Sequence, residues 1–337
     1  MRAFVITGAG QCAVHDVEPP AAGPGEVIVD VARGGVCGTD VEFFAGDMSY
    51  LHSGQASYPV RIGHEWCGTV GAVGAGVDPG WLGRRVTGDT MLGCGTCARC
   101  QGGRPHVCAD RFEIGVRRGW PGALAEQLPV PVTALHALPD SVDDTLGALV
   151  EPGGNALRSV QAAGLAPGER LLVLGPGTIG LLAAQFARAA GCEVHLVGRS
   201  AESLGFARAL GFTSAWLAGD LPPLDFDAVI DASPAPGMPA FAVEAVQPGR
   251  RVVFIGIAGR PSTIDTRALV LKDVTATGIL SASPGIAQTI ERYAAGAVDP
   301  RPLVAATVGL GEVGSVLAGA RPAGAHGGPK IHVDPRR

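Results

Sequence analysis

One stretch decides the fold of this chain: Leu171-Leu172-Val173-Leu174-Gly175-Pro176-Gly177-Thr178-Ile179-Gly180. Four apolar residues typical of a buried strand lead into a Gly-x-Gly-x-x-Gly turn, and a pattern of helical period follows over residues 178–190. In that context Gly175 allows the tight turn, Gly177 lets a pyrophosphate approach, and Gly180 lets the helix pack on the strand. The helix start, Thr178 and Ile179, offers free N–H groups to phosphates. The stretch predicts a dinucleotide-binding unit, with a glycine turn kept only for packing as the alternative.

The residues around this unit repeat its alternation of strand and helix. Apolar, strand-like runs occur at residues 171–174, 193–197, 228–230, 252–255 and 274–279, and helical patterns occupy 178–190 and 201–210. Such βαβ alternation predicts an α/β fold with a doubly wound parallel sheet of the Rossmann type.

The first 150 residues have a different texture. Short β-favouring runs at 3–7, 11–17, 27–33 and 68–73 are separated by Gly and Pro, which predicts a small β-barrel-like domain. A helical pattern begins near Asp140, an amphipathic helix is expected around 286–295, and a last strand at 331–333. We therefore predict domains at 1–150 and 151–285, and a segment at 286–337 that returns to the first domain.

Length and composition set broad limits. A chain of 337 residues exceeds the size at which one core stops growing, so two domains are expected. The net charge of −5 comes without a basic block, which argues against nucleic-acid binding. No apolar run is long enough to span a membrane and no export signal is evident, so we expect a cytoplasmic protein with reduced thiols.

Four of the eight cysteines cluster in a glycine-rich loop at about residues 90–110. Their spacing, C-x2-C-x2-C-x7-C, lets four thiolates close on one ion, which predicts a structural zinc held by Cys94, Cys97, Cys100 and Cys108. Two disulfides or four free thiols are the alternatives. A closed site of this kind leaves no position for a substrate, so the chemistry must lie elsewhere.

The residues after the second Rossmann strand bear on the choice of nucleotide. NAD enzymes usually place an acid there, about 20 residues after the glycine turn, whereas this chain has Gly198-Arg199-Ser200. A guanidinium binds a 2′-phosphate and a hydroxyl donates to it, so Arg199 and Ser200 favour NADP. The alternative is a solvated Arg199 in an enzyme that binds NAD.

A second set of metal-ligand residues lies outside the cysteine loop. Cys37 opens Cys-Gly-Thr-Asp, His64 and Glu65 lie in Gly-His-Glu, and Glu151 opens Glu-Pro at the domain junction. Thiolate, imidazole and carboxylate are all zinc ligands, and together they can leave a position for water or substrate. Each residue alone would be unremarkable, and their conjunction predicts a catalytic zinc.

With these motifs in their order and spacing, nearly the whole chain resembles the zinc-dependent medium-chain dehydrogenases, and most closely their polyol and threonine dehydrogenase branch. The resemblance implies a GroES-like β-rich catalytic domain beside the Rossmann domain. It implies Cys37 and His64 as zinc ligands, Glu65 as a direct or exchangeable ligand, and Glu151 as a ligand or water-holder.

The resemblance also implies roles for several further residues. Thr39 matches the hydroxyl that contacts the alcohol oxygen and passes its proton outward. Glu42 stands where the family often has a relay histidine, and it is either the next proton carrier or a solvated loop acid. Gly256, Ile257 and Leu280 match positions that touch the ribose and carboxamide of the cofactor.

These parts predict hydride transfer between a secondary alcohol and NAD(P), with zinc as Lewis acid. Tyr50, His52 and Arg61 precede Gly-His-Glu and could bind several hydroxyls, which favours a polyol, sugar or cyclitol. Threonine or a simple secondary alcohol is the alternative, the latter with an apolar pocket of residues such as Phe43, Phe44 and Trp120. Two alternatives come from other functional classes. A catalytically inactive dinucleotide sensor would be expected to have lost its zinc ligands, and a zinc hydrolase would have no use for the nucleotide-binding turn. A homodimer or homotetramer through the Rossmann domain is expected.

Overall fold

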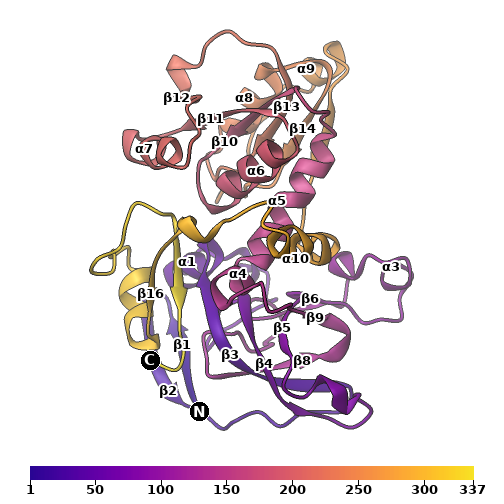
Figure 1. Ribbon diagram of the computed structural model, residues 1–337, viewed down its shortest axis with the longest axis vertical. Coiled ribbons are helices and arrows are strands. Elements are labelled where there is room, and N and C mark those ends of the chain that lie inside the picture. The colour runs from indigo at the N-terminus through magenta and orange to yellow at the C-terminus, as the bar shows by residue number, and fades with distance from the viewer.

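The computed structural model describes residues 1–337 and has two domains joined by helix α5 (Val150–Ala163). Figure 1 shows this helix running from the β-rich domain below into the Rossmann domain above. The predicted boundary at residue 150 falls on its first residue.

The Rossmann domain contains six strands in the order β12-β11-β10-β13-β14-β15, and every neighbouring pair is parallel. Counted along the chain this is the order 3-2-1-4-5-6 of dinucleotide-binding folds, so the predicted doubly wound sheet is confirmed. The strands are β10 (Arg170–Leu174), β11 (Glu193–Gly198), β12 (Ala215–Leu217), β13 (Phe226–Asp231), β14 (Val246–Phe254) and β15 (Thr275–Gly278).

Both faces of this sheet are covered, as period-2 alternation on a fully buried strand requires. Leu171 and Val173 of β10 pack in a core shared with α5 and α6, whereas Leu172 and Leu174 pack in a second core with α8. The helices are α6 (Thr178–Ala189), α7 (Ala201–Ala209), α8 (Met238–Ala245) and α9 (Thr266–Leu271).

The β-rich domain is built on a sheet of order β16-β17-β3-β4-β5-β9, with β8 also paired to β3. A hairpin of β1 and β2 lies beside it and bridges to Val60 and Ala125. Its strands are β1 (Arg2–Gly8), β2 (Gln11–Asp16), β3 (Glu26–Val36), β4 (Glu65–Val73), β5 (Arg85–Gly88), β6 (Met91–Leu92), β7 (Phe112–Glu113), β8 (Gln127–Pro131) and β9 (Leu135–Ala137); its helices are α1 (Gly38–Ala45), α2 (Ser49–His52), α3 (Ala98–Gln101) and α4 (Asp144–Ala148).

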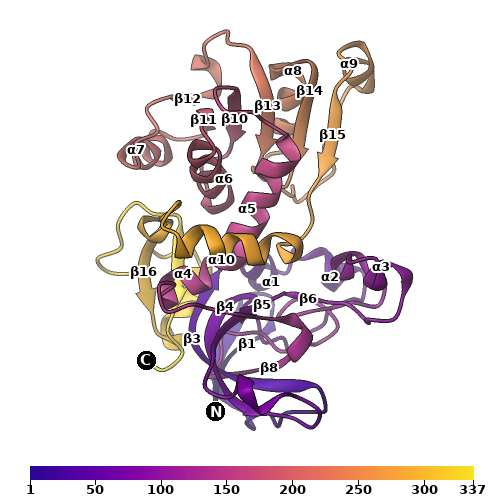
Figure 2. The same cartoon turned by 45° about the vertical axis from the view of Figure 1, so that its right-hand side comes forward.

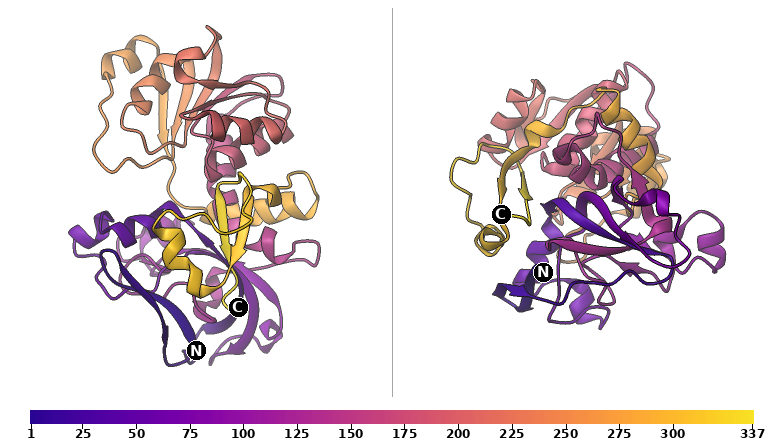
Figure 3. Two further views of the ribbon diagram at one scale, coloured as in Figure 1. Left: turned by 90° about the vertical axis from the view of Figure 1, so that its left-hand side faces the viewer. Right: turned by 60° about the horizontal axis from the view of Figure 1, so that its bottom comes forward.

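The C-terminal segment returns to the β-rich domain. Helix α10 (Ile286–Ala294) packs on α5 between the two domains, as Figure 2 shows. Strand β16 (Val304–Val308) follows, then α11 (Val313–Leu317) and β17 (Lys330–Val333), which pairs antiparallel with β3. Figure 3 shows the yellow C-terminal strands lying along this domain. The pairing places residues more than 290 positions apart side by side.

No helix in the structure has both the length and the apolar character that crossing a membrane would need.

Candidate active site

A cleft with a volume of about 410 Å³ lies between the two domains and is lined by most of the predicted catalytic and cofactor-binding residues, but by none of the four clustered cysteines. The Rossmann domain contributes the glycine turn and the ends of its central strands. The β-rich domain contributes the predicted zinc ligands and a wall beyond them. The lining of the cleft includes Cys37, Thr39, Met48, Tyr50, His64, Glu65, Met91, Glu113, Val116, Glu151, Asn155, Gly177, Thr178, Ile179, Ile257, Leu280 and Lys330.

Three of the predicted zinc ligands are brought together. The Cys37 sulfur, a ring nitrogen of His64 and a carboxylate oxygen of Glu65 lie within 4.8 Å of one another. Burial opposes the charged imidazole, but the Cys37 thiol and the nearby carboxylates raise the pKa of His64 well above its usual value. Such an electron-rich, buried set of donors fits a divalent cation.

Asp40 supports this set and was not singled out from the sequence. It is fully buried, and its carboxylate accepts hydrogen bonds from the backbone N–H of Cys37 at 2.8 Å and of Gly63 at 3.2 Å. Its Oδ1 also lies 3.9 Å from His64 Nδ1. This distance is too long for a hydrogen bond, and His64 Nδ1 has no hydrogen-bond partner, so Asp40 supports the imidazole through its charge and not through a direct contact. The sequence feature that could have identified Asp40 is its position as the third residue of α1, where an acidic side chain can cap the helix.

Glu65 is held by a partner that the motifs did not predict. Both of its carboxylate oxygens accept from Lys330 Nζ at 2.7 Å, and both side chains are almost fully buried. Glu65 lies on β4 and Lys330 on β17, on either side of β3. The pair meets across Gly35, where a Cβ would lie 2.0 Å from Glu65 Oε2. The glycine on the middle strand therefore makes room for the ion pair.

Glu151 approaches the same site from the first turn of α5. Burial raises its pKa to about 7, against the opposing effect of His64. Its Oε1 accepts from Asn155 Nδ2 at 2.8 Å, one helical turn further along. This hydrogen bond orients the carboxylate, and Glu151 as ligand or water-holder stays a prediction.

The cysteine loop has the geometry that four thiolates need around one ion. The sulfur separations are 3.9 Å for Cys94 and Cys100, 3.6 Å for Cys97 and Cys100, and 3.8 Å for Cys97 and Cys108. A tetrahedron with zinc–sulfur bonds of about 2.3 Å has an edge of about 3.8 Å. All eight cysteines are free thiols, so the disulfide alternative is wrong in this structure. Hydrogen bonds from Thr96 lower the pKa of Cys94 to about 6, which favours a ligating thiolate.

The glycine turn fits a pyrophosphate. Gly175 has φ of +93°, a conformation that side chains disfavour. A Cβ on Gly180 would lie 1.9 Å from the Gly175 carbonyl oxygen, so close packing excludes any side chain there. A Cβ on Gly177 would meet no protein atom within 4 Å. The backbone at Gly177 is bare on the cleft side, as the approach of a phosphate requires.

Because Gly177 has space for a side chain and Gly180 has none, alanine at the two positions should have different effects on stability and on nucleotide binding. Gly177→Ala should leave the melting temperature within about 2 °C of the parent, because the added methyl group has space, yet weaken nucleotide binding at least tenfold. Gly180→Ala should lower the melting temperature markedly, because its methyl group overlaps backbone. Thermal melting and nucleotide titration of both variants test the assignment. Unchanged nucleotide affinity in Gly177→Ala would show that the turn serves packing alone.

Arg199 and Ser200, which follow β11, differ in their contacts within the protein. Ser200 is the N-cap of α7 and its Oγ accepts from Ser203 N at 3.2 Å, so helix capping already explains it. Arg199 is exposed and makes no hydrogen bond or ion pair within the protein. Its guanidinium is therefore available to a ligand.

The remaining cofactor residues lie where the strands of the Rossmann sheet end. Ile257 and Leu280 line the cleft and are 74% and 38% exposed, which is a large exposure for apolar side chains, and their contact with the cofactor stays a prediction. Gly256 lies behind them, and a Cβ there would be 2.0 Å from the Ser233 carbonyl oxygen.

Thr39 and Tyr50 line the cleft, but the other expected pocket residues do not. Thr39 Oγ1 makes no hydrogen bond within the protein, so it is free to meet a substrate. Glu42 lies one turn further along α1 and outside the lining. His52 is exposed at the end of α2, and Arg61 lines a separate depression with Trp120. Phe43 and Phe44 belong to the core around β1 and α11.

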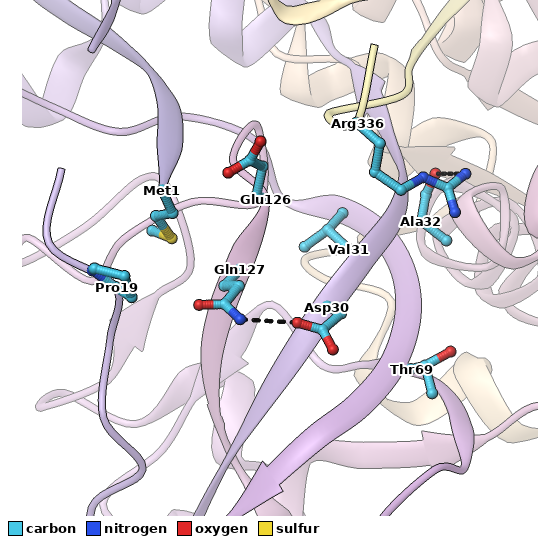
Figure 4. A pocket seen from close by; sticks show the side chains of 9 residues that line it. All are labelled: Met1, Pro19, Asp30, Val31, Ala32, Thr69, Glu126, Gln127 and Arg336. Atoms are coloured by element: carbon cyan, nitrogen blue, oxygen red, sulfur yellow. Dashed lines mark hydrogen bonds between the residues drawn. The ribbon is translucent and has the colours of Figure 1, made fainter. Parts of the chain in front are cut away.

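A second depression, of about 570 Å³, lies on the β-rich domain near the N-terminus (Figure 4). Its polar groups satisfy one another: Gln127 Nε2 donates to Asp30 at 2.9 Å, and Glu126 accepts from Arg2 at 2.7 Å. None of the predicted site residues lines it, so we assign it no ligand.

Comparison with known proteins agrees with this geometry. Residues 23–140 match the model of an alcohol dehydrogenase GroES-like domain, and residues 178–295 match that of a zinc-binding dehydrogenase. An L-threonine 3-dehydrogenase from Idiomarina loihiensis is 32% identical over 276 residues, covering 78% of this chain and 79% of that protein.

Solved structures superpose along the whole chain. A putative zinc-binding dehydrogenase from Sinorhizobium meliloti, bound to NADP, has a TM-score of 0.88 at 29% identity, covering 99% of each chain. An alcohol dehydrogenase from E. coli CFT073, complexed with NADH, has a TM-score of 0.90 at 26% identity, also covering 99% of each chain. The chain therefore belongs to the zinc-dependent medium-chain dehydrogenase family and is an NAD(P)-dependent oxidoreductase that acts on CH–OH donors.

Proposed function

We propose that this enzyme oxidises a secondary alcohol of a polyol, sugar or cyclitol, or reduces the corresponding ketone, with catalysis at the Cys37, His64 and Glu65 site. The observation that carries the proposal is the cleft itself, in which these donors face the glycine turn across the domain boundary while Tyr50 and Glu113 add a polar wall. A simple alkanol would leave these polar groups without partners, which a binding site penalises.

The residues have distinct tasks in this scheme. When bound, zinc supplies Lewis-acid polarisation of the substrate oxygen and the nicotinamide supplies the hydride acceptor. Cys37 and His64 hold the metal, and the buried Asp40 carboxylate adds negative charge beside His64. Thr39 Oγ1, which has no partner in the protein, accepts the proton of the substrate hydroxyl while it releases its own hydroxyl proton to the next carrier or to water. We assign Glu42, one turn further along α1, as the next proton carrier. Ile257 and Leu280 shape the slot for the nicotinamide.

Threonine oxidation is the second candidate. It rests on the similarity of the chain to proteins named L-threonine 3-dehydrogenase. It also rests on the hydrogen-bonded Glu151–Asn155 pair at the start of α5. Threonine differs from a polyol in carrying a carboxylate and an ammonium group, so the two candidates are separable by substrate charge.

The test is a dehydrogenase assay with both nucleotides against secondary alcohols, linear polyols, sugars, cyclitols and L-threonine. We expect the best polyhydroxylated substrate to exceed propan-2-ol in kcat/KM by at least a hundredfold. A preference for short alkanols over every polyol would refute the proposed substrate class while leaving the dehydrogenase assignment intact.

We also propose that NADP is the preferred nucleotide, because the unpaired Arg199 guanidinium stands where an acid would repel the 2′-phosphate. Arg199→Asp is expected to shift the ratio of kcat/KM values toward NAD by one to two decades, since a charge-assisted hydrogen bond contributes about 1.5–3 kcal/mol. Ser200→Ala is the comparison and should act mainly on stability, through the α7 cap. A parent enzyme that already favours NAD tenfold would contradict the assignment.

Self-association through the edge of the Rossmann sheet is proposed on two observations. Strand β15 ends the sheet with its outer edge unpaired, and the nearby helix α9 leaves Val270 78% and Leu271 85% exposed. An open edge beside apolar side chains is a ready surface for a second copy. Leu271→Asp is expected to shift the sedimentation coefficient from oligomer to monomer, and a monomeric parent would refute the proposal. A cytoplasmic location, suited to eight free thiols, is likewise a proposal.

A further inference from the structure

The wall of the cleft beyond the metal ligands contains a buried carboxylate whose hydrogen bonding is incomplete. Glu113, at the end of the short strand β7, is 3% exposed and lines the cleft with Tyr50, Met91 and Val116. Its Oε1 accepts from Tyr50 Oη at 3.0 Å and from Arg111 Nε at 2.7 Å. Oε2 accepts no hydrogen bond in the protein, and it is not among the side-chain atoms shielded from solvent, so it is open to the cleft.

Each nitrogen of the two arginines around this carboxylate donates a hydrogen bond within the protein. Arg111 uses all three of its nitrogens: Nε on Glu113, Nη1 on the Cys108 carbonyl at 3.2 Å, and Nη2 on Tyr50 Oη at 3.2 Å. Arg117 lies over the Tyr50 ring, and its three nitrogens donate to the side chain of Gln55 and to backbone carbonyls. Neither arginine lines the cleft.

The one lysine that lines the cleft already donates all of its N–H groups to acceptors within the protein. Lys330 Nζ has three protons, and its three acceptors are the two Glu65 oxygens at 2.7 Å and the Val36 carbonyl at 2.8 Å. Apart from His64 and the metal that it would hold, the charged residues that line the cleft therefore offer a substrate a free acceptor at Glu113 and no free cationic donor. A carboxylate or phosphate on the substrate would be desolvated there without a partner, beside a negative charge.

We propose that Glu113 is a specificity-determining residue, whose free Oε2 accepts a hydrogen bond from a hydroxyl or ammonium group of the substrate remote from the reacting carbon. The enzyme accordingly takes neutral and amino-substituted polyols, and it discriminates against secondary alcohols that carry a carboxylate or phosphate. This inference rests on the proposed function and separates its two candidates, because threonine brings a carboxylate that the cleft cannot pair.

The arrangement also gives the cysteine loop a part in specificity. Arg111 follows Cys108 by three residues and is tied to its carbonyl, so the metal-bound loop fixes the guanidinium that holds Glu113. The carboxylate is thereby presented on a rigid support, as recognition of a polar group requires.

The experiment compares substrates matched except in charge: D-glucitol, 1-amino-1-deoxy-D-glucitol, D-gluconate and D-glucitol 6-phosphate, with the corresponding cyclitol set and L-threonine. At pH 7 an alkyl ammonium group stays charged. For the parent enzyme we expect kcat/KM to be at least a hundredfold lower for the anionic members than for the neutral member of each series. Turnover of L-threonine or a phosphate ester as efficient as that of the neutral polyol would overturn the inference.

The variant Glu113→Gln keeps the shape of the side chain and removes its charge. We expect the ratio of kcat/KM for the amino polyol to that for the anionic polyol to fall at least a hundredfold. The matched control is Asp110→Asn, an acid to amide change in the same segment at a side chain that is 73% exposed, which should leave the ratio as in the parent. Equal ratios in the two variants would refute the role of Glu113.

Two further measurements keep the outcomes distinct. Thermal melting and nucleotide titration report whether Glu113→Gln is folded, and the charge series of the parent tests the inference even if it is not. Oxidation of propan-2-ol by the parent enzyme tests the dehydrogenase activity on which the inference about Glu113 depends. Failure on every secondary alcohol overturns the proposed function, whereas activity without charge discrimination overturns only the inference about Glu113.

Discussion

Replacing Cys37 or His64 with alanine should lower kcat by about a thousandfold or more, while the protein stays folded and binds nucleotide. A Lewis acid contributes several kcal/mol to stabilisation of developing charge, and each 1.36 kcal/mol is a factor of ten in rate. The two residues belong to one cluster, whose donor atoms lie within 4.8 Å of one another, so the loss of either dismantles the same metal site. The double variant should therefore be hardly worse than either single one.

Zinc content separates this effect from misfolding. The two ligand sets share no residue, so the parent should hold two equivalents of zinc and each variant one, with the cysteine loop still occupied. Cys12→Ala and His15→Ala, on the outer hairpin strand β2, are matched changes that should retain both ions and full activity. Near-normal turnover in Cys37→Ala or His64→Ala would exclude a role for this cluster in the chemistry.

Local motifs carried most of what the sequence could predict. The strand-turn-helix context of residues 171–180 predicted the glycine turn that the structure contains, because Gly180 packs against Gly175 and Val173 within the same segment. Gly175 also contacts Ala232 and Ser233, which follow strand β13. The cysteine cluster was equally accessible to prediction, since its four cysteines lie within fifteen residues. Both motifs encode their geometry in spacing alone, and neither depends on how the domains are placed.

Strands with weak local signals were not predicted. Strand β8 contains Pro129 and Pro131, which usually argue against a strand, and it is tolerated because it pairs only with β3. Strands β5 and β9 are four and three residues long, too short for a convincing alternation. Their positions depend on the sheet around them, so no window of sequence contains the information.

The site residues that sequence reasoning missed act over long separations. Lys330 meets Glu65 across 265 positions, and Tyr50 meets Glu113 across 63. One hint existed for the lysine: only two of the 26 basic Lys and Arg residues are lysines, so each retained lysine merits a specific reason. Conversely, His52 and Arg61 were expected near the substrate from proximity in sequence to Gly-His-Glu, and the chain turns both away from the cleft.

Lys330→Met should be the most destabilising single change near the active site. The Lys330–Glu65 pair is 3% and 2% exposed, and removing one partner of such a pair leaves a buried charge that costs about 3–5 kcal/mol. The β17–β3 pairing that closes the β-rich domain lies at this point, so we expect a lower melting temperature and easier proteolysis of the C-terminal segment. Lys272→Met is the comparison: the only other lysine donates to three backbone carbonyls and has no carboxylate partner, so its loss should cost less.

A double variant and a comparison of metal-stripped with zinc-loaded protein test whether Glu65 is a zinc ligand. Adding Glu65→Gln to Lys330→Met removes the stranded charge and should recover most of the lost stability, because a neutral pair carries no uncompensated ion. Metal-stripped and zinc-loaded protein should be melted in parallel. If Glu65 is an exchangeable zinc ligand, zinc compensates its charge, and Lys330→Met destabilises the loaded protein much less than the stripped protein. Equal destabilisation in both states would place Glu65 outside the coordination shell, and a variant that melts with the parent would show that the ion pair contributes nothing to the fold.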